Sequence, residues 1–111
     1  MIPELDAARV RRWADGRTPA EYLNEMRLEV DETPRSLTVL DCRPPWSDSI
    51  GPEWIRTPVA RLRYVMKRNE WTLYWPDRNS RFHLYDLTEP TQHVAELLDE
   101  IDADPTFIFW G

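Results

Sequence analysis

The segment from Pro58 to Asp86 constrains the fold most strongly, because its apolar residues alternate with polar ones in three successive runs. The apolar positions are even in the first run, odd in the second and even in the third: Ala60, Leu62, Tyr64 and Met66, then Trp71, Leu73 and Trp75, then Phe82 and Leu84. Side chains of a β-strand point alternately to opposite faces, so the pattern predicts three antiparallel strands. The apolar residues change from even to odd positions between one strand and the next. They stay on the same face of the sheet only if the loop that joins the two strands has an even number of residues. We therefore predict two-residue turns at Arg68-Asn69 and Arg78-Asn79, with four-residue loops as the alternative.

The pairing that follows from these turns separates an apolar sheet face from a polar one. The apolar face stacks Leu62, Trp75 and Phe82 in one row, and Tyr64, Leu73 and Leu84 in the next. The polar face stacks Arg63, Tyr74 and His83, then Val65, Thr72 and Tyr85, with Arg61 and Arg81 beside Pro76. The predicted ligand-binding residues are those of this polar face that carry charge or a polar ring: Arg61, Arg63, Tyr74, Arg81, His83 and Tyr85. The same residues are also typical of plain cross-strand packing, with arginine stems lying on tyrosine rings beneath another element.

The flanking sequence predicts a single α+β domain over residues 1–111. Its N-terminal part, residues 1–25, begins with a helix that starts at Pro3, presents a face of Leu5, Ala8, Arg12 and Trp13, and stops near Gly16. A capping box from Thr18 to Glu21 predicts a short second helix. Residues 26–86 then form an antiparallel sheet of about five strands, because strands are also predicted at 26–31 and 36–43.

A long connection and a C-terminal helix complete the predicted domain. Residues 44–57 are expected to form a structural flap held down by apolar side chains, namely those of Trp46, Ile50, Trp54 and Ile55. In the last part, residues 87–111, a helix is predicted to begin at Thr88-Glu89-Pro90 and to pack a stripe of Val94, Leu97, Leu98 and Ile101 on the apolar sheet face. Acidic residues near the end of this helix predict a basic neighbour. The apolar terminus 106–111 should dock on its own core or on a second subunit.

Charge is unevenly distributed along the chain, whose net charge is −6. Residues 58–85 carry six basic and two acidic groups, whereas residues 86–111 carry seven acids and no lysine or arginine. The predicted sheet is therefore basic within an acidic molecule. This argues against indiscriminate nucleic-acid binding, but a local basic strip remains able to bind an anion. The other arginine cluster, Arg9, Arg11, Arg12 and Arg17, is interpreted as a solvated helix face.

The sequence contains no established catalytic, metal-binding or membrane signature. A single cysteine, Cys42, excludes a disulfide framework and a multi-cysteine zinc site, and its place in an alternating strand predicts a buried thiol. Phosphate-binding glycine loops and zinc-protease or hydrolase motifs are missing, so no cofactor or metal is predicted. His83 is the one candidate general base, although the pattern places no acid beside it. Without a membrane span or signal peptide, we expect a cytoplasmic protein.

Four sequence blocks carry a resemblance to a known family: DCRPPW at 41–46, TPVARLRY at 57–64, WTLYWPDRNSRFHLYD at 71–86 and DPTFIFWG at 104–111. Together they resemble DUF3024, a bacterial family of domains of unknown function, from about Leu37 to Gly111. The positions that match the family pattern are Arg43, Pro44, Arg63, Tyr64, Trp71, Tyr74, Trp75, Asp77, Arg78, Asn79, His83, Tyr85, Trp110 and Gly111. The resemblance implies an intact domain, and it implies no activity because none is assigned to the family.

Three functions remain open from the sequence. The favoured one is a non-enzymatic binding module whose polar sheet face recognises an anionic ligand, such as a nucleic acid, a nucleotide or an acidic protein segment. The second is a homodimer that uses this face or the FIFWG tail as its subunit contact. The third is a small hydrolase or transferase with His83 as general base and Arg63 holding an anion.

Overall fold

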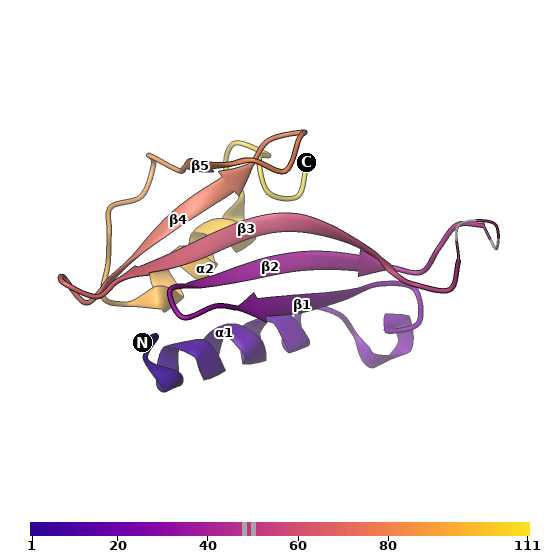
Figure 1. Ribbon diagram of the computed structural model, residues 1–111, viewed down its shortest axis with the longest axis horizontal. Helices are drawn as coiled ribbons and strands as arrows, with labels where there is room; N and C mark the ends of the chain where they lie inside the picture. The colour runs from indigo at the N-terminus through magenta and orange to yellow at the C-terminus, as the bar shows by residue number, and fades with distance from the viewer. Residues whose placement is uncertain (48, 50) are drawn as a thin grey trace.

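The computed structural model describes residues 1–47, 49 and 51–111, which form a five-stranded antiparallel sheet and two α-helices (Figure 1). The strands follow one another in the order β1-β2-β3-β4-β5, so every strand pairs with its neighbour in sequence. The elements are α1 (Glu4–Gly16), the 3₁₀ turn η1 (Ala20–Tyr22), β1 (Arg27–Glu32), β2 (Ser36–Arg43), β3 (Ile55–Val65), β4 (Glu70–Pro76), β5 (Phe82–Leu84) and α2 (Val94–Ala103). The predicted α+β class and the antiparallel sheet of about five strands are confirmed, and the meander predicted over residues 58–86 extends over all five strands. None of the described helices is long and apolar enough to cross a membrane.

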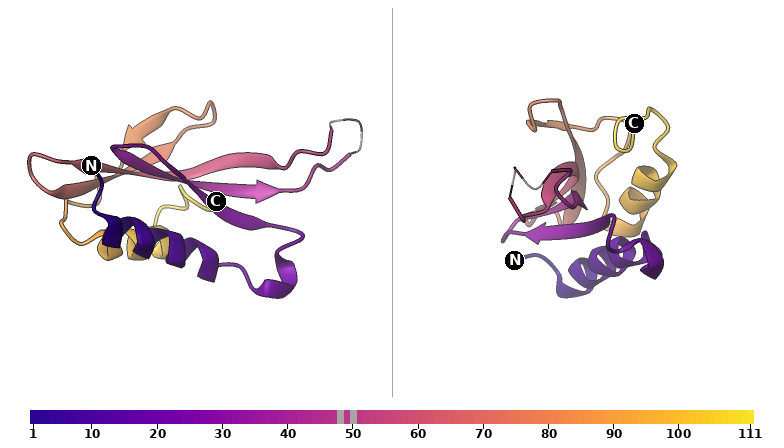
Figure 2. Two further views of the ribbon diagram at one scale, coloured as in Figure 1. Left: turned by 60° about the horizontal axis from the view of Figure 1, so that its bottom comes forward. Right: turned by 90° about the vertical axis from the view of Figure 1, so that its right-hand side faces the viewer.

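Both helices lie on the same side of the sheet and leave its other face open (Figure 2). Helix α1 packs against β1 and α2, and it buries Ala7, Val10 and Ala14. The predicted face through Leu5 is wrong, because the Leu5 side chain is 83% exposed. The face that turns inward consists of small and medium-sized side chains, and the larger Leu5 lies outside it.

Helix α2 contributes the stripe that the sequence predicts. Val94, Leu97, Leu98 and Ile101 are all buried, in one core cluster with Leu62 and Leu73 of the sheet. The helix begins at Val94 and not at the predicted Thr88-Glu89-Pro90. Thr91 explains the delay, because its backbone forms an antiparallel bridge with Trp71 through two hydrogen bonds of 2.7 and 3.0 Å. Because Thr91 is bridged to β4, the helix starts only after it, and the residues from 86 to 90 form a turn and an irregular segment.

The apolar terminus docks on its own core, which is one of the two predicted alternatives. Asp104 ends α2 in the left-handed conformation, with φ of 43°. Its carboxylate accepts hydrogen bonds from the backbone N–H groups of Phe109 and Trp110, at 3.0 and 2.9 Å. The Trp110 indole N–H donates to the carbonyl of Ile101 at 2.8 Å. The tail thus folds back over the end of α2.

The predicted basic neighbour of the α2 terminus is Arg17, which follows α1. Its guanidinium forms an ion pair with Asp102 and stacks on the Trp110 ring, 4.4 Å from the ring centroid. The predicted capping box before η1 does not form, because Pro19 occupies the cap and the buried Thr18 hydroxyl has no hydrogen-bond partner among the described residues.

The β3–β4 connection keeps the predicted faces but shifts the predicted pairing. Leu62 lies opposite Leu73, and Arg61 lies opposite Tyr74. The loop therefore contains four residues, 66–69, with Asn69 in the left-handed region at φ 52°. A four-residue loop preserves the parity of the strands and moves each partner by two positions. The predicted pair of Leu62 with Trp75 is accordingly wrong.

The β4–β5 connection has an odd number of residues and reverses the predicted faces of β5. Pro76 lies opposite Phe82, and Trp75 lies opposite His83. Residues 77–80 form a tight turn, Ser80 takes the left-handed region at φ 61°, and the Asp77 N–H donates to the Arg81 carbonyl. This is a type I turn with a following bulge residue, which adds one residue to the loop. Phe82 and Leu84 therefore lie on the open face, and the predicted packing of α2 on them is wrong.

Strands β2 and β3 extend past the helices as a long arm (Figure 1). The connection between them covers residues 44–54, since β3 begins at Ile55 and not near residue 58. Trp46 is 80% exposed and Ile55 is 41% exposed, so the predicted pinning of a flap by these two side chains is wrong. Trp54 does pack, because the Arg27 guanidinium lies 4.2 Å from its ring centroid. The predicted contribution of Ile50 lies outside the described residues.

Candidate anion-binding site on the open sheet face

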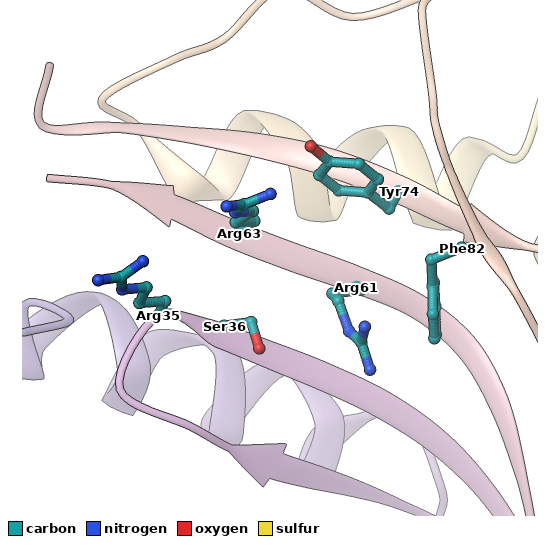
Figure 3. Close-up of a pocket in the computed structure, with 6 residues that line it drawn as sticks. All are labelled: Arg35, Ser36, Arg61, Arg63, Tyr74 and Phe82. Carbon is teal, nitrogen blue, oxygen red and sulfur yellow. The ribbon is translucent and has the colours of Figure 1, made fainter. Parts of the chain in front are cut away.

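A shallow depression of about 340 Å³ lies on the open face across β2, β3, β4 and β5. Its lining is basic and aromatic, and consists of Arg35, Ser36, Arg61, Arg63, Tyr74 and Phe82 (Figure 3). A second depression of about 210 Å³ shares Arg35 and Arg63 and continues to Lys67 in the β3–β4 loop. The two hollows therefore adjoin at Arg35 and Arg63, and we call the pair of them the track. We call the region around Arg35, Arg61 and Arg63 the basic half of the open face.

Arg61 is held in place by uncharged partners. Its Nε–H donates to the hydroxyl of Thr38, directly opposite on β2, at 2.9 Å. Its guanidinium lies over the Phe82 ring, 4.0 Å from the centroid. These contacts fix the plane of the guanidinium without neutralising its charge.

Arg63 and Arg35 lie at the other end of the depression. Arg63 is exposed, and its cross-strand neighbours are Ser36 on β2 and Thr72 on β4. Arg35 belongs to the β1–β2 turn, where its carbonyl accepts the Tyr64 N–H at 2.8 Å. Within residues 1–47, 49 and 51–111, no carboxylate forms an ion pair with Arg35, Arg61 or Arg63. The basic half thus carries three charges without local compensation.

The remainder of the open face, over β1 and the beginning of β3, also contains arginines but neutralises them. Arg56 binds Asp31 at 3.0 Å and Glu29 at 3.2 Å, and Arg27 binds Glu29 at 3.0 Å. We call this group the compensated half. Cys42, directly opposite Arg56, is fully buried as predicted, and burial raises the pKa of its thiol.

The structure brings together half of the residues that the sequence analysis selected. Arg61, Arg63 and Tyr74 share the open face, whereas His83 and Tyr85 lie on the face that carries the helices, and Arg81 is in the β4–β5 loop. Three lining residues were missed, namely Arg35, Ser36 and Phe82. Phe82 was assigned to the wrong face, and Arg35 lies in a turn whose position depends on β2–β3 pairing across the long connection. A parity count contains no signal for either.

The whole chain matches one family profile. Residues 2–111 match DUF3024, a domain of unknown function. The chain belongs to this family. No curated protein and no solved structure gives a significant match to it.

The positions that carry the DUF3024 resemblance divide between the core and the open face. Trp71 is fully buried, and its indole N–H donates to Asp6 of α1 at 2.9 Å, so it ties β4 to the helix. Tyr85 is buried and its hydroxyl donates to Glu100 at 2.6 Å; burial, followed by this carboxylate, raises the pKa of Tyr85 to about 12. Arg63 and Tyr74, by contrast, line the depression. These two therefore have no comparable packing role.

His83 has an acidic partner that the sequence pattern did not predict. Its Nε2 lies 2.8 Å from Asp77 Oδ2, and its ring stacks against Trp75 at 4.8 Å between centroids. Asp77 also accepts the backbone N–H groups of Asn79 and Arg81, at 2.8 and 3.0 Å. The His83 hydrogen bond, followed by the one from Arg81, lowers the pKa of Asp77 to about 2. In this DUF3024 chain the pair closes the β4–β5 loop, with Arg63 on the opposite side of the sheet.

Metal-binding side chains do not gather in the described part of the chain. No group of three or more His, Cys, Asp or Glu residues there lies close enough to hold an ion. The arginines of the basic half are hydrogen-bond donors and repel cations. The hydrogen-bond donors and the positive charge of this site suit an anionic group better than a cation.

Proposed function

We propose that this protein is a non-enzymatic binding module that recognises an anionic ligand through the basic half of its open sheet face. The observation that carries the proposal is the set of three arginines, Arg35, Arg61 and Arg63, which surround one depression without a carboxylate partner among the described residues. Arginine stays charged at any physiological pH and presents up to five N–H donors in a planar fork. An anion is the ligand that satisfies such donors.

The distribution of charge over the molecule supports the same function. Residues 86–111, which include α2, carry seven acids and no lysine or arginine. Helix α2 lies behind the sheet, on the side away from the arginines (Figure 3). An anion is therefore repelled by one side of the protein and attracted by the other, which orients its approach.

The two alternative functions have less support. A homodimer through the FIFWG tail competes with the docking of Phe109 and Trp110 on Asp104 of the same chain. A homodimer through the open face brings two uncompensated arginine clusters together, which is electrostatically costly. A hydrolase with His83 as base and Arg63 as anion holder needs two residues that lie on opposite sides of the sheet.

The test is an equilibrium titration with short-chain inorganic polyphosphate, followed by NMR of the arginine Nε–Hε groups. We expect saturable shifts at Arg35, Arg61 and Arg63. The Arg61→Ala/Arg63→Ala variant should bind at least about 10-fold more weakly, because each lost charge-assisted hydrogen bond contributes about 1.5–3 kcal/mol before screening.

The matched control is Arg9→Ala/Arg12→Ala, which removes the same charge from exposed positions on α1. This variant should bind polyphosphate as the wild type does and melt at the wild-type temperature, and the Arg61→Ala/Arg63→Ala variant should still unfold in one cooperative transition. Equal weakening by the two double variants would mean that net charge alone governs binding. That result, or a complete lack of binding at low salt, contradicts the proposal.

A further inference from the structure

We propose that the anionic ligand is a single strand of nucleic acid, with its phosphates on Arg35, Arg61 and Arg63 and its bases on the aromatic rings of the depression. This inference rests on the function proposed above and names the ligand class for the same site. Three features of the site favour a single strand over a small anion, a duplex or an acidic protein segment: the shape of the track, the aromatic surfaces and the way in which Arg61 is held.

The first feature is that the basic groups are arranged along a line. Arg61 and Arg63 are two residues apart on β3, which places them about 6.6 Å apart along the strand. The two depressions share Arg35 and Arg63, and Lys67 lines the second of them. A small anion is held by donors that converge on one point, whereas a polyanion with regularly spaced charges is held by donors that follow its path.

The second feature is the presence of planar rings among the charges. Tyr74 pairs with Arg61 across β3 and β4, and its half-buried ring lies on the open face (Figure 3). Phe82 lies on the other side of Arg61 in the same depression. Unpaired bases stack on aromatic rings and on arginine planes, and this stacking tolerates any base. The carboxylates of an acidic peptide have no comparable use for these rings.

The third feature is that Arg61 is itself part of a stacked surface. The Phe82 ring supports one side of its guanidinium at 4.0 Å, and Thr38 fixes its Nε. The opposite side of the guanidinium is thereby presented in a fixed orientation, so little rotamer entropy is lost when a base or a phosphate binds. A duplex keeps its bases stacked inside, and its phosphates alone meet the site. The rings would then contribute nothing, which is why a single strand fits better.

The experiment measures fluorescence anisotropy with four labelled probes of equal length: oligothymidylate, oligouridylate, an abasic strand and a duplex. We expect both base-bearing single strands to bind at least about 10-fold more tightly than the abasic strand and the duplex. Tyr74→Ala should weaken binding of the base-bearing strands by about 5- to 100-fold and leave the abasic strand unaffected. Tyr74→Phe, which keeps the ring, should bind within about 2-fold of the wild type.

Salt dependence provides a second readout that separates charge from stacking. The logarithm of the binding constant for oligothymidylate should fall with the logarithm of salt concentration with a slope near −2, because three phosphate contacts each contribute about −0.7. Arg63→Ala should reduce this slope by about 0.7, whereas Tyr74→Ala should leave it unchanged. A Tyr74→Ala slope that fell like that of Arg63→Ala would contradict the assignment of bases to the ring.

The possible failures are distinguishable. Equal affinity for base-bearing and abasic strands, or tighter binding of the duplex, overturns the single-strand inference while the polyphosphate titration still supports an anion site. Failure of all four probes together with polyphosphate overturns both proposals. Binding of polyphosphate but of none of the four probes leaves the anion site and excludes nucleic acid as its ligand.

Discussion

The open face of the sheet has a basic half and a compensated half, and both are built around arginines on β3. Arg56, in the compensated half, reaches across β2 and meets Asp31 and Glu29 of β1. Arg61 and Arg63, a few residues later on the same strand, meet Thr38 and Ser36 on β2. All three residues are arginines on β3, and they differ only in the side chains that they meet on the neighbouring strands. The strand register around a surface arginine therefore decides whether it meets a carboxylate of the protein or not.

The difference also separates what each half contributes. The compensated half covers Cys42 and Leu40, which are 0% and 7% exposed although they point to the open side. Its arginines form ion pairs with carboxylates of the same chain, so few of their N–H donors remain for a ligand. The basic half keeps its donors unsatisfied by carboxylates and surrounds a depression. The following predictions change one half so that it resembles the other, or test the features that distinguish the two halves.

The largest effect is expected from Arg63→Glu, which places a carboxylate where it can pair with Arg61 or Arg35. This substitution converts the basic half into a second compensated half. We expect affinity for oligothymidylate to fall on the order of 100-fold, because a contact is lost and a repulsive charge is added. Anisotropy measures the affinity, and thermal melting should show an unchanged fold. Retained binding would show that the ligand uses another surface.

A gain in affinity is expected from the opposite change. Glu29→Gln with Asp31→Asn removes the carboxylates that neutralise Arg56 and Arg27. Asp31 is in the same cross-strand row as Thr38 and Arg61, about two strand spacings away and therefore within the range of electrostatic interaction. Affinity for oligothymidylate at low salt should rise about 3- to 10-fold, and the gain should shrink at near-physiological salt. Unchanged affinity would mean that the two halves are electrostatically independent.

Stability should respond to the compensated half and hardly to the basic half. Arg56→Ala leaves Glu29 and Asp31 without their common partner, and should lower the free energy of unfolding by a small but measurable amount. Arg63→Ala removes no ion pair and should stay within about 0.5 kcal/mol of the wild type. Urea unfolding measures both. A larger loss for Arg63→Ala than for Arg56→Ala would reverse the roles assigned to the two halves.

The smallest effect concerns the loop that places Phe82 in the basic half. Asp77 has its pKa lowered to about 2, chiefly by the hydrogen bond with His83. Because the folded pKa is below the unfolded value of about 3.9, the stabilisation is complete above that value and is lost as the pH falls towards 2. NMR titration of the Asp77 carboxyl carbon should show a midpoint near 2 in the wild type and a higher one in His83→Ala. An unchanged midpoint would exclude His83 as the main cause.

The sequence predicts the elements well where the signal is local. Strand β2 has the predicted bounds, Ser36–Arg43, and the i, i+3, i+4, i+7 stripe of α2 is buried as predicted. The predicted face of α1 is wrong, because the prediction relied on large apolar residues such as Leu5. The buried contact is formed by Ala7, Val10 and Ala14. Helix rotation depends on what the helix packs against, and a single segment does not contain that information.

Only part of the site was predicted, again because a single segment does not contain the information that places the other residues. Arg61, Arg63 and Tyr74 share a face because of alternation within β3 and β4 and an even-numbered loop between them. The β4–β5 loop contains one more residue than the predicted two-residue turn. His83 and Tyr85 therefore lie on the other face of the sheet, and Phe82 lies on the open face. The Asp77 side chain stabilises that longer turn through two backbone N–H groups and His83. A side-chain cap of this kind is not visible in a parity count.

The amino-acid sequence by itself determined the strands, the α2 stripe and the separation of basic from acidic segments. These follow from covalent geometry, because alternation in a strand and the 3.6-residue turn of a helix operate within a few residues. Only the tertiary structure decided which arginines found carboxylates and which face each residue of β5 occupies. Both depend on register between segments far apart in the chain, and one additional loop residue is enough to move every side chain of a strand to the other face.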